Sequence, residues 1–212
     1  MTWARSRPAA TAAAAAVLIW SAAIAHRRTV SDTEERAFRA INDRAARMPG
    51  PIWMVMQAGS LPAVFVAAGV AHRLHARHDG VAIVAGGSAL WAGVKLAKRP
   101  VGRGRPWEFL DDGHVRGIAP TGLGYPSGHA AISTALALLL TSPGPTRCAA
   151  LCTTALTSTA RVYVGAHLPL DVIGGVAIGT LAARTIDALT QVRPARRLRP
   201  LRAAGRCLAC VR

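Results

Sequence analysis

The chain has 212 residues, 51% of them hydrophobic, and a formal net charge of +16. This combination argues against an ordinary soluble domain and favours a basic membrane protein. One span needs about 20 mainly apolar residues to cross about 30 Å of hydrocarbon, so about six spans would use most of the chain. We therefore expect an all-α fold, a polytopic membrane helix bundle of about six transmembrane helices.

Apolar runs along the chain predict where these spans lie. The runs lack the two-residue alternation of a barrel strand, and lipid tolerates only helices or closed barrels, so all are predicted to be helices. The fourth and fifth runs are short or weakly apolar. Small residues such as Gly174 and Gly175 favour close helix packing. The predicted spans cover residues 9–25, 51–71, 80–97, 128–142, 147–164 and 168–186.

The first apolar run has a second interpretation. Arg5 and Arg7 precede it, and Ala23-Ile24-Ala25 ends it, as in a signal peptide with a small-residue cleavage site. Cleavage would remove one span and leave the later loops on the same side of the membrane. Both interpretations therefore predict the same placement of the functional motifs.

The segment Thr29–Met48 mixes charged residues with Phe38 and Ile41. This pattern predicts an amphipathic helix on the outer surface, with Asp32 through Glu35 suited to its first turn. Such a helix would flank the path of a lipid to the site. A plain connecting loop fits the sequence equally well.

Lysines and arginines predict the orientation of the bundle, because they favour the cytoplasmic side. A cytoplasmic N-terminus places the arginine-rich C-terminal tail on that side and the segments 26–50, 98–127 and 165–167 outside. The outer loop is nevertheless basic, with Arg99 and Arg103. Departures of this kind tend to be functional.

We expect a single domain over residues 1–192, with its motif core at 80–186, and a basic tail at 193–212. The proline and alanine content of the tail predicts disorder, and its arginines favour anionic lipid headgroups over nucleic acid. Cys207 and Cys210 form a lone Cys-x-x-Cys pair, which is weak evidence for zinc or redox chemistry. A reduced cytoplasmic pair is the default expectation.

The first chemical motif follows the third predicted span, where Lys98 precedes Arg105 and Pro106. Proline and glycine residues between them prevent a long continuation of the helix. Basic side chains at a helix end often extend toward the membrane surface, which is one interpretation. The other is phosphate binding, since cations on a short loop can close on one phosphate and the arginine fork matches its oxygens.

The second motif, Pro126-Ser127-Gly128-His129, opens the fourth span. Ser127 is a natural N-cap, and a helix N-terminus offers free backbone N–H groups and a positive dipole end to an anion. Gly128 would let the anion approach closely. A capped helix with a histidine at the membrane interface fits equally well.

The third motif places Arg161 before His167 and Asp171. Pro169 suits the first turn of a new helix, which puts His167 and Asp171 on one face. The carboxylate can then accept a hydrogen bond from the imidazole and leave the other ring nitrogen free to attack. The alternative is an interfacial histidine near an aspartate that the helix dipole favours.

Together these motifs resemble those of the type 2 phosphatidic acid phosphatase superfamily, which includes bacterial lipid-diphosphate phosphatases. The family pattern is a lysine, six residues and Arg-Pro; then Pro-Ser-Gly-His; then Ser-Arg, five residues, His, three residues and Asp. The matching positions are Lys98, Arg105-Pro106, Pro126 to His129, Arg161, His167 and Asp171. Ala160 stands where the family usually has serine, which removes a hydroxyl near the phosphate but no attacking or protonating group.

The resemblance implies that His167 attacks phosphorus and forms a phosphohistidine, while Asp171 orients it. It also implies that His129 protonates the leaving oxygen and then activates water. No metal or other cofactor is needed in such a mechanism. The residues implied to hold the phosphate are Lys98, Arg105, Ser127, Gly128 and Arg161.

The expected function is that of an integral plasma-membrane phosphatase whose active site faces the extracytoplasmic side. Its substrate would be a lipid phosphate, either a polyprenyl diphosphate or monophosphate or a phosphatidate-like lipid. The alternative is a lipid phosphotransferase that passes the phosphoryl group to a lipid or sugar instead of water. The sequence leaves the identity of the lipid and the oligomeric state open.

Overall fold

The computed structural model describes residues 6–44, 50–73 and 78–191. The end of the predicted domain at 192 and the predicted basic tail at 193–212, with Cys207 and Cys210, lie outside the described residues. All regular structure in the described ranges is helical. The helices are α1 (Ser6–His26), α2 (Asp32–Asn42), α3 (Gly50–Gln57), α4 (Leu61–Arg73), α5 (Gly80–Val101), a 3-10 turn η1 (Pro106–Glu108), α6 (Gly128–Leu140), α7 (Pro145–Tyr163) and α8 (Pro169–Gln191).

The predicted fold class, an all-α membrane helix bundle, is confirmed. Among the described residues, three helical segments are long and apolar enough to cross a membrane: Pro8–His26, Gly80–Glu108 and Pro169–Thr190. The pair α3 and α4 makes a fourth if it counts as one bent span. Helix α6 has only 13 residues, and α7 has a mean hydropathy too low for the same criterion. Six crossings therefore stay a prediction.

The second predicted span, at 51–71, is not one continuous helix. The segment divides into α3 and α4, which meet at an angle of 67°. Pro62 stands in the first turn of α4, a position that proline favours because its missing N–H has no helical partner there. The sequence Gly59-Ser60-Leu61-Pro62 thus carried a signal for a new helix start.

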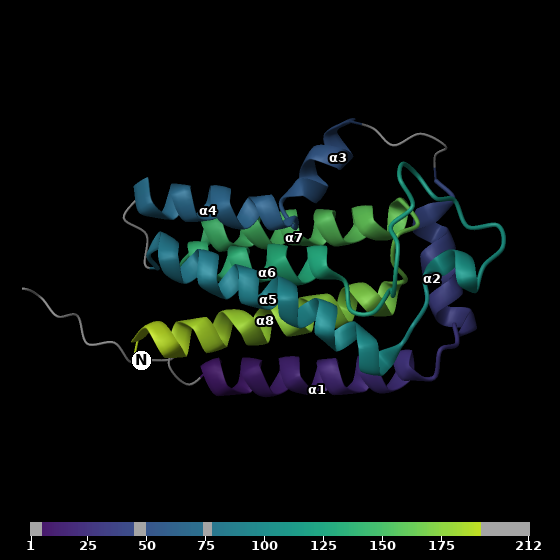
Figure 1. Cartoon of the computed structure of the whole chain (residues 1–212), viewed down its shortest axis with the longest axis horizontal. Helices are drawn as coiled ribbons and strands as arrows, with labels where there is room; N and C mark the ends of the chain where they lie inside the picture. The colour runs from purple at the N-terminus through teal and green to yellow at the C-terminus, as the bar shows by residue number, and fades with distance from the viewer. Residues whose placement is uncertain (1–5, 45–49, 74–77, 192–212) are drawn as a thin grey trace, which may run out of the picture.

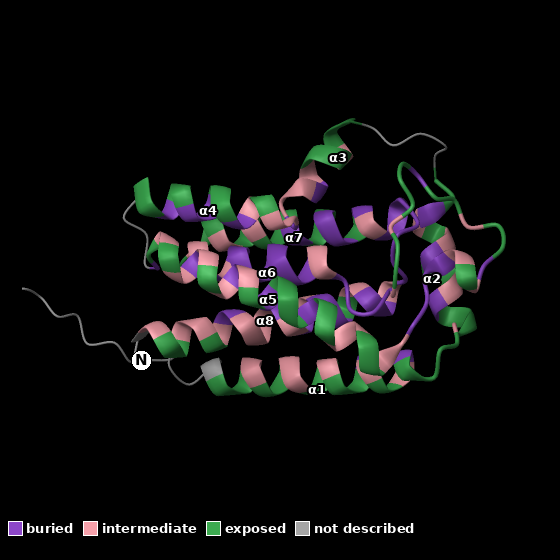
Figure 2. Cartoon of the chain, in the orientation of Figure 1, coloured by how far each residue is buried: buried purple, intermediate pink, exposed green. Residues whose placement is uncertain are grey.

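The long helices pack side by side, and α2 lies across one end of the bundle (Figure 1). The segment between α5 and α6 covers the same end. Helix α6 is the centre of the bundle, and most of its residues are buried (Figure 2). A helix that is apolar on all sides belongs in such a position, which explains how a short helix serves as the core.

Helix α8 packs very closely against α6 because it carries small residues on the facing side. A Cβ atom at Gly175 would collide with the backbone carbonyl of Ser127, and one at Gly179 with that of Ala131. Only glycine permits this spacing of the two backbones. The close packing brings the N-terminal ends of α6 and α8 together.

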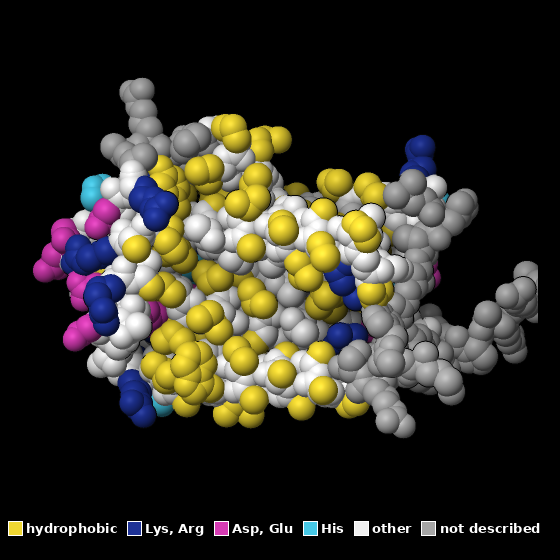
Figure 3. Space-filling view, turned by 180° about the vertical axis from the view of Figure 1, so that it is seen from behind, with side chains coloured by type: hydrophobic (Ala, Val, Ile, Leu, Met, Phe, Trp, Pro, Cys, Tyr) yellow, Lys and Arg dark blue, Asp and Glu magenta, His cyan; other side chains and the backbone are white. Residues whose placement is uncertain are grey.

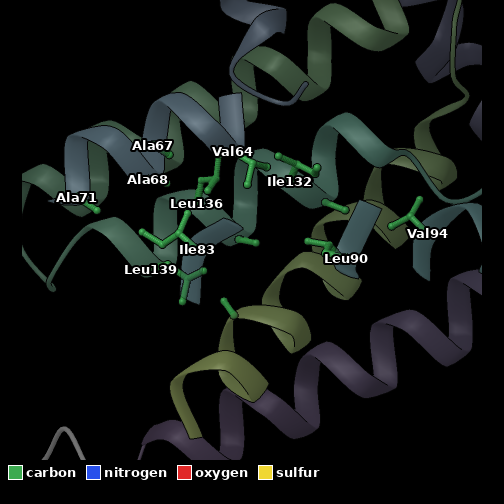
Figure 4. Close-up of a cluster of buried hydrophobic side chains, with 13 residues drawn as sticks. Val64, Ala67, Ala68, Ala71, Ile83, Leu90, Val94, Ile132, Leu136 and Leu139 are labelled. Atoms are coloured by element: carbon green, nitrogen blue, oxygen red, sulfur yellow. The ribbon is translucent and has the colours of Figure 1, made fainter. Parts of the chain in front are cut away.

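A large apolar cluster joins α4, α5, α6 and α8 (Figure 4). Its members include Val64, Ile83, Leu90, Ile132 and Leu136. On the outside, hydrophobic side chains cover the flank of the bundle, whereas charged side chains gather at the end where α2 lies (Figure 3). An apolar flank next to a polar end is the surface expected of a protein embedded in lipid.

The predicted amphipathic helix within Thr29–Met48 is present as α2, and Ser31 is its N-cap. Its apolar face is covered by the end of the bundle, because Phe38 is only 1% exposed and packs with Leu110 and Leu168. Asn42 fixes the other end of α2 through hydrogen bonds to the carbonyls of Val162, Tyr163 and His114. Helix α2 is thus part of the fold rather than a separate surface element.

Candidate active site

The three sequence motifs meet at the end of the bundle next to α2. The first lies at the C-terminal end of α5, the second at the N-terminal end of α6, and the third spans the connection between α7 and α8. The backbone N–H of Ser127 donates to the carbonyl of Asp171 at 2.8 Å, which joins the starts of α6 and α8 directly. Segments far apart in sequence therefore form one site (Figure 1).

Lys98 points from the last turn of α5 into the loop that follows. The helix ends at Val101 because Gly102 adopts a left-handed conformation with φ of 64°. The Lys98 Nζ atom donates to the carbonyls of Leu123 and Gly124 at 2.8 and 2.7 Å. These two bonds hold the ammonium group in the loop that leads into α6.

Arg105 contacts the third motif directly. Its Nη1 atom donates to the carbonyl of Ala166 at 2.6 Å and lies 3.2 Å from Nε2 of His167. Its Nε atom donates to the carbonyl of Gly122 at 2.8 Å. The guanidinium group is therefore fixed between the loop 102–127 and the α7–α8 connection, beside the imidazole.

Ser127 occupies the N-cap position of α6, as the sequence predicted, but its hydroxyl makes no capping hydrogen bond. The Oγ atom is buried and has no hydrogen-bond partner among the residues that the structure describes. The first N–H groups of a helix also lack partners within the helix. The start of α6 thus offers an uncommitted hydroxyl and the backbone N–H of Gly128, which is a suitable combination for an anion.

His129 and Arg161 line the same cavity, which has a volume of about 190 Å³. Met56 and Gln57 from the end of α3 complete part of its wall. The Nε atom of Arg161 is buried without a hydrogen-bond partner in the described parts of the chain. One residue that lines the cavity thus carries a donor that no described residue satisfies.

His167 and Asp171 contact each other as their spacing predicted. The Nδ1 atom of His167 lies 3.4 Å from Oδ2 of Asp171. Burial lowers the pKa of His167 well below its ordinary value, and the positive charges of Arg105 and Arg161 lower it further. The imidazole is therefore neutral at pH 7, and the tautomer with the proton on Nδ1 lets that atom donate to Asp171 and leaves the lone pair on Nε2.

Asp171 is held by two further groups. Its Oδ2 atom accepts from the backbone N–H of Leu168 at 3.0 Å, and its Oδ1 atom lies 3.2 Å from Nη1 of Arg103. Arg103 is completely buried and also binds Glu34 on α2, at 2.6 Å between Nη2 and Oε2. In the sequence, Arg103 stands out only as a departure from the charge rule, and no local pattern connects Glu34 with the site.

Ala160, the one departure from the family pattern, is buried in an apolar cluster with Met56, Tyr163 and Val164. It does not line the cavity that His129 and Arg161 share. The alanine methyl group therefore serves packing at this position.

Within the described ranges, no group of three or more His, Cys, Asp or Glu residues is placed to hold a metal ion. Asp112 of the adjacent acidic pair Asp111-Asp112 instead binds Arg39 of α2, at 2.6 Å. The hydrogen bond from Arg39 lowers the pKa of Asp112. That carboxylate belongs to the outer surface of the loop, away from the buried histidine.

Comparison with known proteins gives three findings. The model of the PAP2 superfamily matches residues 81–195. An undecaprenyl-diphosphatase of Sulfolobus acidocaldarius is 40% identical over 88 residues, which are 41% of this chain and 43% of that protein. The alignment thus spans less than half of the relative's length.

The fold also matches a solved structure, the first transmembrane PAP2 type phosphatidylglycerolphosphate phosphatase from Bacillus subtilis. The TM-score is 0.66 at 20% sequence identity, and the match covers 88% of this chain and 98% of the other. At this identity the likeness shows a shared fold.

Proposed function

Since the chain belongs to the PAP2 superfamily, we propose that it is a membrane lipid phosphatase that hydrolyses a lipid phosphomonoester or diphosphate through a phosphohistidine. The observation that carries this proposal is the convergence of three cationic side chains with two histidines and an uncommitted serine hydroxyl. The cations, Lys98, Arg105 and Arg161, would neutralise the equatorial phosphate oxygens. That neutralisation is the main task in phosphoryl transfer.

In the first step, Nε2 of His167 attacks phosphorus, and the bond from phosphorus to the lipid or diphosphate oxygen breaks. His129 gives its proton to that leaving oxygen. Asp171 accepts a hydrogen bond from Nδ1 throughout and stabilises the positive charge that develops on the imidazole. The distance of 3.2 Å between Arg105 and Nε2 would put a phosphate held by Arg105 next to the attacking atom.

In the second step, water attacks the phosphohistidine and the P–N bond breaks. His129, which lost its proton in the first step, takes a proton from this water. Inorganic phosphate is released and His167 returns to its neutral form. The low pKa of His167 favours this return. In a site that already holds several positive charges, the cationic phosphohistidine is less stable than the neutral imidazole, which therefore leaves readily.

The shape of the bundle supports a lipid as the substrate. An apolar groove of about 610 Å³ lies between α4, α6 and α7, and its lining includes Val66, Ala137 and Leu140. Gln57 lines both this groove and the cavity with His129 and Arg161. A hydrocarbon chain in the groove would therefore have its phosphate near His129 and Arg161.

The relative from Sulfolobus acidocaldarius suggests an undecaprenyl diphosphate as the first lipid to test. A long isoprenoid is also compatible with a groove that is lined mostly by aliphatic side chains. The distribution of lysines and arginines supports an active site at the extracytoplasmic face of the plasma membrane. Fusion of reporter enzymes to the loops at 26–50 and 98–127 would test that orientation.

The enzyme assay measures phosphate release by the protein in detergent from undecaprenyl diphosphate, its monophosphate, phosphatidate and phosphatidylglycerophosphate. We expect release from at least one of them, and its loss in His167→Ala and His129→Ala. His114→Ala is the matched control, because the His114 side chain is 54% exposed and pairs with Asp43 on the outer surface. A chelator should leave the activity intact.

Full activity in either catalytic variant, or loss of activity in chelator, would contradict the histidine mechanism without a metal. A label transferred from the substrate to a second lipid, with no free phosphate, would support the phosphotransferase alternative instead. The lipid with the highest kcat/KM identifies the substrate class.

A further inference from the structure

We propose that Glu34 is a positioning residue for the nucleophilic histidine, acting through Arg103 and Asp171. The proposal rests on the function proposed above and extends it to a helix outside the three motifs. Glu34 lies in the first turn of α2, 69 residues before Arg103 and outside the segment matched by the family model. Nothing in the sequence joins it to the catalytic histidine.

A continuous series of contacts connects Glu34 with the imidazole. Glu34 accepts from Nη2 and Nη1 of Arg103 at 2.6 and 3.0 Å. The same Nη1 atom contacts Oδ1 of Asp171 at 3.2 Å, and the other Asp171 oxygen faces Nδ1 of His167 at 3.4 Å. Each member of the series therefore has its orientation set by the one before it.

All three charged residues of this series are buried, which restricts the partners that each can have. Arg103 and Asp171 are 0% exposed, and Glu34 is 6% exposed. Charges this deep are kept only when their partners are close and well oriented. The planar guanidinium donates one hydrogen each from Nη1 and Nη2 to Glu34, the second Nη1 hydrogen to Asp171 and the second Nη2 hydrogen to the carbonyl of Thr29. Because Nη1 is shared, the position of Glu34 constrains where the carboxylate of Asp171 can lie.

Glu34 also fixes the start of α8 itself. Its Oε1 atom accepts from the backbone N–H of Leu170 at 3.0 Å, in the first turn of that helix. A carboxylate is favoured there by the helix dipole and satisfies a donor that has no helical partner. Asp171 is the next residue, so one side chain on α2 holds both the backbone N–H just before Asp171 and the counter-ion of its carboxylate.

Positively charged residues and a net negatively charged group lie on different sides of the His167 imidazole. Lys98, Arg105 and Arg161 form the cationic side on which the phosphate would bind. Behind the imidazole lie the two carboxylates and Arg103, which together carry a net negative charge. This negative group would stabilise the imidazolium that forms on attack, and removal of the Glu34 charge would weaken it.

The first test compares Glu34→Gln with wild type. The amide side chain of this variant keeps an oxygen for the N–H of Leu170 but loses the charge that holds Arg103. We expect kcat to fall about 10- to 100-fold, the size of effect that follows when the hydrogen-bond partners that orient metal-binding histidines are removed. KM and inhibition by inorganic phosphate should change less than about twofold, since Glu34 does not touch the phosphate-binding cations.

Glu35→Gln is the matched control, one residue along the same helix. Glu35 is partly exposed and pairs with Arg39 at 2.8 Å, with no contact to the buried series. We expect its kcat to stay within about twofold of wild type. Glu34→Asp keeps the charge on a shorter side chain and should recover part of the kcat that Glu34→Gln loses. If Glu34→Gln does not fold, lowered kcat with unchanged KM in Glu34→Asp is the deciding result.

The second test separates positioning from a general structural role. Glu34→Gln is introduced into Asp171→Asn, and residual phosphate release is measured with a radiolabelled lipid phosphate. If Glu34 acts through Asp171, the substitution should reduce kcat by less than about threefold in this background. Thermal unfolding in detergent checks that each variant is folded.

Two results would overturn the proposal while leaving the proposed function intact: a wild-type kcat in Glu34→Gln, or the same fold-reduction in both backgrounds. Absence of phosphatase activity in the wild-type protein on every lipid tested would contradict the proposed function. The role of Glu34, which rests on that function, would then be contradicted as well.

Discussion

Nδ1 of His167 lies 3.4 Å from Oδ2 of Asp171, and the two residues are one helical turn apart at the start of α8. The same oxygen of Asp171 also accepts from the backbone N–H of Leu168. The carboxylate therefore cannot rotate freely, and it holds the imidazole with Nε2 toward Arg105. The orientation of the His167 imidazole follows from a local contact that the tertiary structure then stabilises.

The low pKa of His167 has a consequence for stability. The unfolded chain takes up a proton on this histidine below pH about 6.5, whereas the folded protein resists protonation. Falling pH therefore favours the unfolded chain, and the free energy of unfolding should decrease by about 1.4 kcal/mol per pH unit from this group below pH 6.5.

His167→Gln removes this contribution. Unfolding in detergent, measured between pH 5 and 8, should show a weaker loss of stability at acid pH in the variant than in wild type, and parallel curves above pH about 7.5. Identical pH dependence in the two proteins would mean that His167 titrates normally in the folded protein.

Ser127→Ala tests whether the uncommitted hydroxyl binds phosphate. We expect kcat/KM to fall about 10- to 100-fold, because a hydrogen bond to a charged group contributes about 1.5–3 kcal/mol. Stability should not fall, since the Oγ atom makes no capping bond. Ser158→Ala is the control: its hydroxyl is also buried without a described partner, but it lies on α7 and lines a different hollow. An equal effect of the two substitutions would contradict a specific role for Ser127.

Gly59→Ala tests the bend between α3 and α4. A Cβ atom at Gly59 would collide with the backbone of His129, so His129 or α3 must shift. We expect a loss of about 1–3 kcal/mol in stability, as for other overpacked positions, and a fall in kcat of more than about tenfold from the displaced histidine. Gly69→Ala on α4 is the control, because no atom lies within 4 Å of its added Cβ. It should leave activity unchanged.

Ala137→Phe tests the groove as the site of the hydrocarbon chain. The larger side chain would fill space between α4, α6 and α7. We expect KM for a long-chain lipid phosphate to rise about tenfold or more, while kcat/KM for a short, water-soluble phosphate ester stays within about twofold. Equal losses for both substrates would indicate damage to the catalytic site rather than to lipid binding.

Much of the site could be predicted because its chemistry is local in sequence. His167 and Asp171 are four residues apart, and Ser127 and Gly128 start a helix, so their relative placement follows from helix geometry. For Ser127, the sequence predicts the position at the start of the helix but not the state of its hydroxyl. Its position as N-cap was correct, but its free hydroxyl is visible only when all neighbouring groups are in place.

The sequence by itself indicated the helical fold class, the family pattern and the candidate reactive residues, because apolar runs and short spacings act within one helix. The tertiary structure decided which buried charges meet. Arg103 and Glu34 are 69 residues apart, and no local pattern selects one carboxylate among the acidic residues of α2 as its partner. That choice depends on which side of α2 is covered by the end of the bundle, where a charge is stable only beside its opposite.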